Sequence, residues 1–189
     1  IGENGRYQAY ETLQVMMETA RAREEVQAGD LKLSGLVFDG DGDRCFRLDY
    51  NPEQNEIIVS SGDQLGLHLA RNIIKRDALG TGKPWFINTV ESDLKTAITA
   101  EEEGYTSVIT GVGDKWILKK AVLDMIRAQV QDSDMSTDVV LDLLKREEAG
   151  EDLSGLEISK AWKNCLESGA TKTDGADYRF QVGIEESGH

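Results

Sequence analysis

Apolar residues recur along the chain with two different spacings, and this pattern predicts alternating helices and strands. Leu13, Met16 and Ala20 recur at helical spacing, so we expect an amphipathic helix over residues 10–28, after a polar entry loop at 1–6. Runs with period-two alternation or β-branched residues predict three strands after this helix. These strands cover residues 33–38, 44–50 and 56–60.

The chain from Asp63 onward has the pattern of a parallel α/β unit. A helix from Asp63 to about Gly80 is followed by two predicted strands, 85–90 and 107–110, with a helix at 93–103 between them. Two strands joined by a helix should be parallel. The remaining predicted elements are a helix over 116–130, two helices within 132–177 and a final strand over 178–182. We therefore expect an α/β fold, with a mixed sheet sandwiched by helices.

An acidic loop, Asp39-Gly40-Asp41-Gly42-Asp43-Arg44, lies between the first two strands. At ~5 Å and an effective dielectric of ~20, each pair of these carboxylates repels by roughly 3 kcal/mol. The glycines let the backbone curl, so that the three side chains can converge. An all-oxygen site suits Mg²⁺ or Mn²⁺ better than zinc. We therefore expect this loop to hold a divalent cation.

Other interpretations of the acidic loop fit the sequence less well. An EF-hand loop would need Gly and Glu where this chain has Arg44 and Tyr50. A phosphatase of the haloacid-dehalogenase type would use Asp39 as nucleophile and Asp41 as acid and base, but its usual Thr is replaced by Asp43. A merely acidic hairpin turn does not readily give three evenly spaced aspartates followed by arginine. A non-catalytic, metal-binding interaction module stays as a further alternative.

Asp-Gly-Asp-Gly-Asp-Arg after an apolar strand resembles the metal loop of the α-D-phosphohexomutases, the phosphoglucomutase/phosphomannomutase superfamily. Two further stretches, in the same order as in that family, resemble its third-domain loop (Thr110–Lys115) and its sugar-recognition loop (Glu185–His189). One departure is Ile184, where the family usually has Gly. The resemblance implies the fold of the family's middle domains, with a helical insertion at 132–177.

The resemblance also implies roles for individual residues. The metal ligands for Mg²⁺ would be Asp39, Asp41 and Asp43, and the catalytic residues Arg44 and Lys115. The substrate would contact residues in the two later loops. These are Gly113, Asp114, Glu185, Ser187 and His189. Because the third-domain loop follows a parallel strand and precedes a helix, we expect its glycine N–H groups to face an anion.

The implied reaction moves a phosphoryl group between C1 and C6 of glucose or mannose phosphate, through a hexose 1,6-bisphosphate and a phosphoserine. The sequence contains no Thr-x-Ser-His-Asn-type phosphoserine loop. We therefore expect a fragment, inactive alone, whose phosphoserine comes from the remaining domains of the same polypeptide. Residues 1–60 would end the metal-binding second domain, and residues 61–189 would form most of the third.

Composition narrows the possible partners. The chain has 189 residues, of which 39% are hydrophobic and 30% charged, and its formal net charge is −14. This charge argues against nucleic acid and anionic membranes as partners, so local positive groups and a metal must attract a phosphate ester. No apolar run approaches the ~20 residues of a membrane span. Cys45 and Cys165 are too few for a disulfide framework, which favours a cytoplasmic location.

Overall fold

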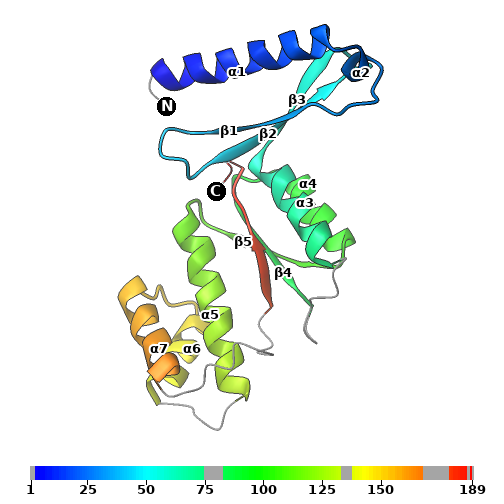
Figure 1. The fold of residues 1–189 in the computed structure, drawn as a ribbon. Coiled ribbons are helices and arrows are strands. Elements are labelled where there is room, and N and C mark those ends of the chain that lie inside the picture. The colour runs from blue at the N-terminus through cyan, green and yellow to red at the C-terminus, as the bar shows by residue number, and fades with distance from the viewer. Residues whose placement is uncertain (1–2, 75–82, 133–137, 168–178, 187, 189) are drawn as a thin grey trace.

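The computed structural model describes residues 3–74, 83–132, 138–167, 179–186 and 188. The strands are β1 (Ser34–Phe38), β2 (Cys45–Asn51), β3 (Glu56–Ser60), β4 (Trp85–Thr89), β5 (Thr106–Thr110) and β6 (Phe180–Gly183). The helices are α1 (Glu3–Ala22), α2 (Glu24–Gln27), α3 (Gly62–Ile74), α4 (Leu94–Glu102), α5 (Asp114–Asp132), α6 (Asp138–Glu148) and α7 (Gly155–Glu167). The predicted α/β class is confirmed. In place of one mixed sheet, the described strands form an antiparallel sheet, β1-β2-β3, and a parallel sheet, β5-β4-β6 (Figure 1).

The antiparallel sheet is covered on one face by α1 (Figure 1). Alternation along β2 places Leu48 and Tyr50 on this face, where they pack against Met16 and Ala20 of α1 and Val26 of α2. These side chains form one small apolar core of their own. The acidic loop joins β1 to β2 at one end of this sheet.

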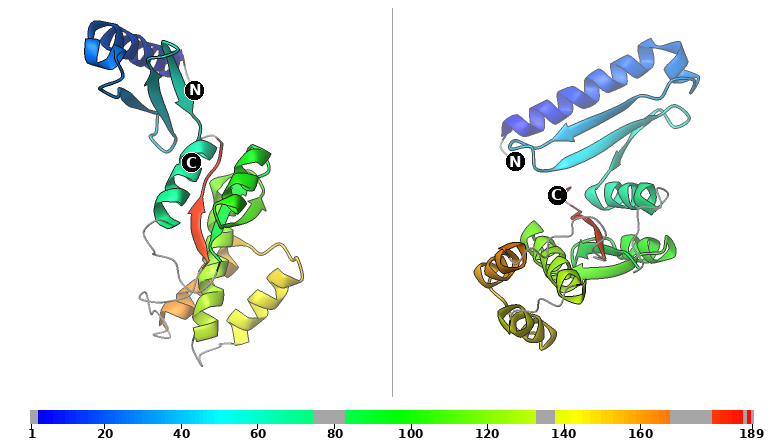
Figure 2. Two further views of the ribbon diagram at one scale, coloured as in Figure 1. Left: turned by 90° about the vertical axis from the view of Figure 1, so that its right-hand side faces the viewer. Right: turned by 60° about the horizontal axis from the view of Figure 1, so that its bottom comes forward.

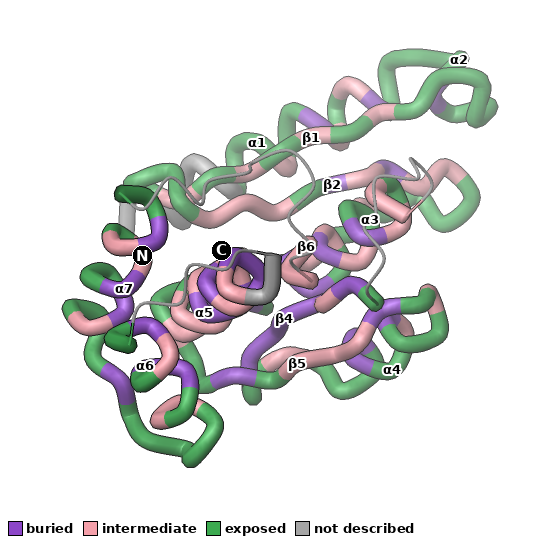
Figure 3. Tube along the Cα trace, turned by 90° about the horizontal axis from the view of Figure 1, so that it is seen from below, coloured by how far each residue is buried: buried purple, intermediate pink, exposed green. Residues whose placement is uncertain are grey.

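Helices cover both faces of the parallel sheet (Figure 2). On one face, α3 and α4 bury Phe86, Tyr105 and Val182. On the other face lies α5, whose Ile117 contacts the backbone of β6 at Gly183. The connections from β4 to β5 and from β5 to β6 run in opposite directions, and right-handed crossovers then place their helices on opposite faces. The central strand β4 is almost wholly buried (Figure 3).

The two helices predicted within residues 132–177 are confirmed as α6 and α7, which pack against α5 (Figure 1). Their shared apolar cluster is separate from the sheet's core. It consists of Leu123, Ile126, Val140, Leu143, Leu144, Leu153, Ile158, Ala161 and Cys165. An ion cluster joins α6 to α5 as well, because Glu147 pairs with Lys120 and Arg127. Burial opposes ionisation of Glu147, but these two cations lower its pKa.

A capping box begins α7. The Ser154 hydroxyl and backbone N–H both donate to Glu157 Oε2, at 2.7 and 2.9 Å, and the Glu157 N–H donates to Ser154 Oγ at 3.3 Å. Arg146 donates to the other Glu157 oxygen at 2.9 Å. The hydrogen bonds from Ser154 and the pairing with Arg146 lower the pKa of Glu157 to about 2. The ionised carboxylate thus stabilises the start of this helix.

Most predicted elements agree with the structure to within about two residues. Asp93 caps α4 by accepting a hydrogen bond from the Lys95 N–H at 2.9 Å, and Gly104 follows that helix with φ of +99°. The entry loop predicted for residues 1–6 is wrong from Glu3 onward, because a polar helical turn carries no apolar periodicity to reveal it. None of the described helices is both long enough and apolar enough to cross a bilayer.

Protonation of Glu157 should weaken α7. Because its folded-state pKa of about 2 lies below the ordinary value of 4.5, its stabilising effect is complete above pH 4.5 and is lost as the pH falls toward 2. We expect the difference in melting temperature between wild type and Glu157→Gln, measured by calorimetry, to be largest near neutral pH. It should vanish as the pH falls below about 2.

The matched control is Glu167→Gln, which neutralises an exposed carboxylate on the same helix. Within the described part of the chain, Glu167 forms an ion pair only with Lys163, at 3.6 Å. The melting temperature of this control should follow that of the wild type over the same pH range. A difference for Glu157→Gln that stays constant down to about pH 2 would contradict the assignment.

Candidate functional site

Three loops meet beside the carboxyl edge of the parallel sheet. Glu185, which follows β6, accepts a hydrogen bond from the Gly113 N–H in the loop after β5. Farther along the same segment, the Gly188 carbonyl accepts a hydrogen bond at 3.3 Å from the Cys45 N–H, at the end of the acidic loop. The three stretches singled out in the sequence are therefore neighbours in space, at the edge where open α/β sheets bind ligands.

Asp39 organises the acidic loop. Its Oδ1 accepts hydrogen bonds from the N–H groups of Gly42 and Arg44, at 3.1 and 3.3 Å. Its Oδ2 lies 3.7 Å from Arg44 Nε. Gly42 has φ of +78°, a conformation that glycine adopts without strain. The loop is thus held by one of its own carboxylates.

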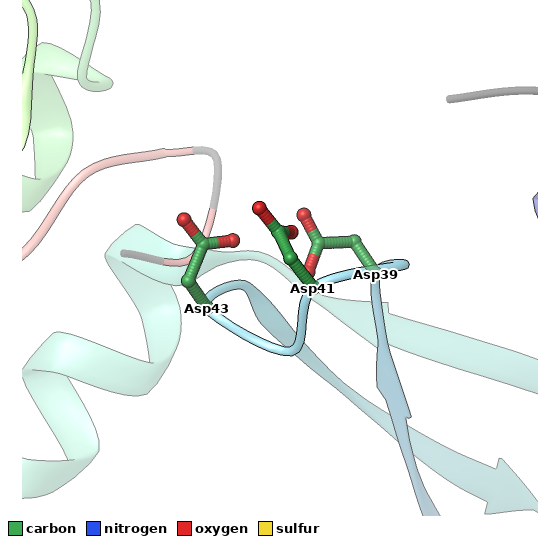
Figure 4. A group of neighbouring side chains, drawn as sticks. All are labelled: Asp39, Asp41 and Asp43. Carbon is green, nitrogen blue, oxygen red and sulfur yellow. The ribbon is translucent and has the colours of Figure 1, made fainter.

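The carboxylates of Asp39, Asp41 and Asp43 converge on one side of the loop (Figure 4). One oxygen from each lies within 4.8 Å of the other two. A backbone hydrogen bond lowers the pKa of Asp41, but a hydrogen bond with Asp43 and the negative charges of Asp39 and Asp43 outweigh it and raise the pKa. A divalent cation would relieve this repulsion, and three carboxylate oxygens fit the preference of Mg²⁺. The predicted ligand set is therefore geometrically consistent.

Glu185 connects the loop after β6 to the loop after β5. Its side chain is 6% exposed, and its Oε1 accepts the hydrogen bond from Gly113. We expected the glycine N–H groups of this loop to face an anion, and that of Gly113 donates to the carboxyl group of Glu185, an acceptor that belongs to the protein itself. At the start of α5, the exposed Asp114 accepts a hydrogen bond from the Lys115 N–H at 2.6 Å.

The loops approach so closely that two glycines are required. A Cβ on Gly62, the first residue of α3, would stand 1.8 Å from the Glu185 carbonyl oxygen. The Gly62 N–H donates to the Glu186 carbonyl at 3.1 Å. Gly188 has φ of +92°, and a Cβ there would lie 2.6 Å from the Cys45 carbonyl oxygen. Any larger residue at either position would push the loops apart.

Ile184 is the position where the chain departs from the pattern of its family resemblance. The side chain is buried and contacts α3 at Gly66, where a Cβ would lie 2.5 Å from Ile184 Cγ2. The Ile184 N–H donates to the Ile87 carbonyl at 3.0 Å, so the segment continues along β4 past the end of β6. The larger side chain is thus accommodated by a glycine in the facing helix.

From the sequence alone, no role in this site was assigned to two acidic residues, Asp63 and Glu186. Asp63 is 1% exposed; its Oδ2 accepts a hydrogen bond from the Asp93 N–H at 2.7 Å, and its Oδ1 has no hydrogen-bond partner among the described atoms. Glu186 accepts a hydrogen bond from the Ser61 hydroxyl at 2.9 Å, across 125 positions of sequence. Burial, with the nearby Asp63 and Asp93, raises the pKa of Glu186. An acidic residue in a first helical turn is ordinary, so the sequence carries no signal for this contact.

The other predicted site residues have different surroundings. Arg44 is half-buried at the end of the acidic loop. Lys115 is exposed, and its Nζ lies 5.5 Å from the centre of the Trp116 ring. Ser187 and His189 lie outside the described residues, so their roles stay predictions.

Comparison with known proteins gives a consistent set of relatives. No family model matches the chain. It is 33% identical over 102 residues to the phosphoglucosamine mutase of Lactococcus lactis subsp. cremoris (strain MG1363), which covers 53% of the chain and 20% of that relative. The phosphoglucosamine mutase of Streptomyces coelicolor is 35% identical over 86 residues, which cover 46% of the chain and 18% of that relative. That of Syntrophus aciditrophicus is 31% identical over 103 residues, which cover 54% of the chain and 21% of that relative.

The chain thus spans about a fifth of the length of the curated relatives that it matches. Its resemblance to the α-D-phosphohexomutase superfamily, first indicated by three short motifs, is confirmed by these relatives.

Asp41→Asn should weaken metal binding without harming the fold. Asp41 is exposed, and its removal lowers the repulsion within the loop, so we expect the metal-free variant to melt at the same temperature as wild type or higher. We expect Mg²⁺ affinity to fall by at least about tenfold, measured by isothermal titration calorimetry. Asp39→Ala should lower both the Mg²⁺ affinity and the melting temperature of the metal-free protein, because two backbone N–H groups lose their acceptor. A melting temperature below that of wild type for metal-free Asp41→Asn would contradict the view that Asp41 serves metal binding and not the fold.

Glu185→Ala should separate the two loops that Glu185 joins. The Gly113 N–H would lose its acceptor in a part-buried setting, which costs at most about 1–3 kcal/mol of unfolding free energy. Glu185→Gln keeps an acceptor oxygen and should cost less. Hydrogen exchange at the Gly113 amide measures the effect directly, and we expect it to accelerate most in Glu185→Ala. Equal exchange rates in wild type and both variants would show that the contact does not protect the loop.

Proposed function

We propose that this chain is part of an α-D-phosphohexomutase, which moves a phosphoryl group between the C1 and C6 hydroxyls of a hexose phosphate. The observation that supports this most is the meeting of three loops through two hydrogen bonds, Cys45 to Gly188 and Gly113 to Glu185. Each of these loops matches a stretch of the same family, in the same order. The relatives' shared name, phosphoglucosamine mutase, agrees with this reaction class.

In this proposal Asp39, Asp41 and Asp43 hold Mg²⁺, which when bound supplies positive charge beside the phosphoryl group in transfer. Arg44 extends from the end of the same loop, and its planar guanidinium suits bidentate contact with a phosphate. Lys115 offers a second cation from the start of α5. Catalysis of this kind depends on positioning and charge, which rigid loops supply.

The sugar would lie against the other two loops. Glu185, Ser187 and His189 would contact its hydroxyls, with Gly113 and Asp114 beside them. Because Glu185 also holds Gly113, a sugar bound to this carboxylate would be fixed relative to both loops. The hexose 1,6-bisphosphate intermediate would reorient here before it returns a phosphoryl group.

The remaining parts of the proposal concern the whole polypeptide. Residues 1–60 would belong to the second domain and residues 61–189 to the third, with α6 and α7 within an insertion at 132–177. The phosphoserine would come from another domain of the same polypeptide, acting in the cytoplasm. Glucose and mannose phosphates are the substrates that the Glu-Glu-Ser-Gly-His variant favours, and the relatives' name adds glucosamine phosphate as a third candidate.

A phosphatase with Asp39 as nucleophile is less compatible with the sequence. Such an enzyme would need a second acidic residue a few positions after Gly113-Asp114, and the chain continues there with Lys115-Trp116-Ile117-Leu118. An interaction module is the other alternative, and metal binding without turnover would favour it.

A coupled mutase assay tests the proposal. It uses the complete polypeptide that carries this sequence, primed with glucose 1,6-bisphosphate, with and without Mg²⁺. Glucose 1-phosphate, mannose 1-phosphate and glucosamine 6-phosphate are compared as substrates. We expect metal-dependent turnover on at least one of them, with kcat lowered about 100-fold or more by Asp41→Asn.

The matched control is Asp142→Asn, which removes a carboxylate on α6 whose side chain is 70% exposed. Its ion pair with Arg146 is long, at 4.0 Å. The kcat of this control should equal that of wild type. No turnover on any of the three sugars, from folded protein that binds Mg²⁺, would overturn the mutase proposal.

A further inference from the structure

A groove of about 540 Å³ lies between α5 and α7 and adjoins the site described above, with which it shares Lys115. Its walls are mostly apolar and come from both helices and from the segment before α7. The apolar lining consists of Trp116, Leu118, Val122, Leu153, Ile158 and Trp162. A volume of this size, lined by apolar and aromatic side chains with a few polar groups, is typical of small-molecule sites.

Two ammonium groups give this groove a positive end. Lys115 Nζ and Lys119 Nζ lie 5.5 and 5.0 Å from the centre of the Trp116 ring. Lys119 is neutralised by Asp152, at 2.9 Å, and also donates to the Leu153 carbonyl at 2.8 Å. Lys115 forms no ion pair with a described residue, so its positive charge beside the Trp116 ring is not neutralised at short range. Trp162 lines the same groove.

We propose that this groove binds a small aromatic molecule that carries one anionic group. The rings would lie against the indoles of Trp116 and Trp162, and the anionic group would pair with Lys115. Charge complementarity selects the occupant, because a chain of net charge −14 repels anions except where a local cation is exposed. The inference does not depend on the proposed mutase function.

The groove also touches the third-domain loop. The Trp116 ring lies 3.4 Å from the position of a Cβ on Gly111, so the indole packs directly on the loop backbone. Lys115 belongs both to this loop and to the groove lining. A ligand on Trp116 is thus separated from the candidate site by one side chain.

Two probes with the same ring system test the charge requirement. 8-Anilinonaphthalene-1-sulfonate carries a sulfonate, and N-phenyl-1-naphthylamine is its uncharged counterpart. We expect the 189-residue chain to bind one equivalent of the anionic probe about tenfold more tightly than the neutral one. Probe fluorescence gives both affinities, and energy transfer from tryptophan reports proximity. In Lys115→Gln the preference for the anionic probe should disappear, while the affinity for the neutral probe is kept.

A filling variant tests the location. Ser159 lines the groove from α7 and is exposed, so Ser159→Trp should weaken both probes at least about tenfold without entering the core. The matched control is Lys160→Trp, one position along the same helix and outside the groove lining, which should bind as wild type does. Circular dichroism confirms that each variant is folded. Unchanged binding in folded Ser159→Trp, or a preference that persists in Lys115→Gln, would overturn the proposal.

Discussion

The position of β6, and with it the candidate site, depends on one buried carboxylate. Asp124 of α5 is 2% exposed and accepts hydrogen bonds from the backbone N–H groups of Arg179 and Phe180 and from the Arg179 side chain. The Arg179 guanidinium also lies 4.0 Å from the centre of the Trp85 ring. A buried carboxylate is stable only when its oxygens are paired, so Asp124 determines where this four-residue strand begins.

The opposite end of β6 is fixed by close packing. At this end the chain lies between two helices. Gly183 contacts Ile117 of α5, and the next residue, Ile184, contacts Gly66 of α3. The residues that follow immediately make the hydrogen bonds to the two other loops. Their positions are therefore determined by interactions within the protein, before any ligand binds. Preorganisation of this kind lowers the entropy that ligand binding would otherwise lose.

Much of this architecture follows from local sequence, and the rest does not. The strand at 56–60 and the capped helix after Asp93 were predictable, because apolar period and cap chemistry act over a few residues. The acidic loop was predictable for the same reason. The contacts of Glu185 with Gly113 and of Glu186 with Ser61 were not, because each joins positions far apart in sequence through a single carboxylate. Long-range contacts of this kind depend on strand order, which no local pattern encodes.

For so acidic a chain, the binding of an anionic substrate as proposed would depend on short-range interactions. Fields between exposed charges are screened beyond ~8 Å at physiological ionic strength, so the net charge of −14 influences encounter more than the bound state. Arg44 beside the acidic loop and Lys115 at the start of α5 are local cations of the predicted site. Lys115 also lies at the boundary between that site and the groove formed with α7. The net charge therefore opposes the approach of any anion, and a few fixed cations decide where one is held.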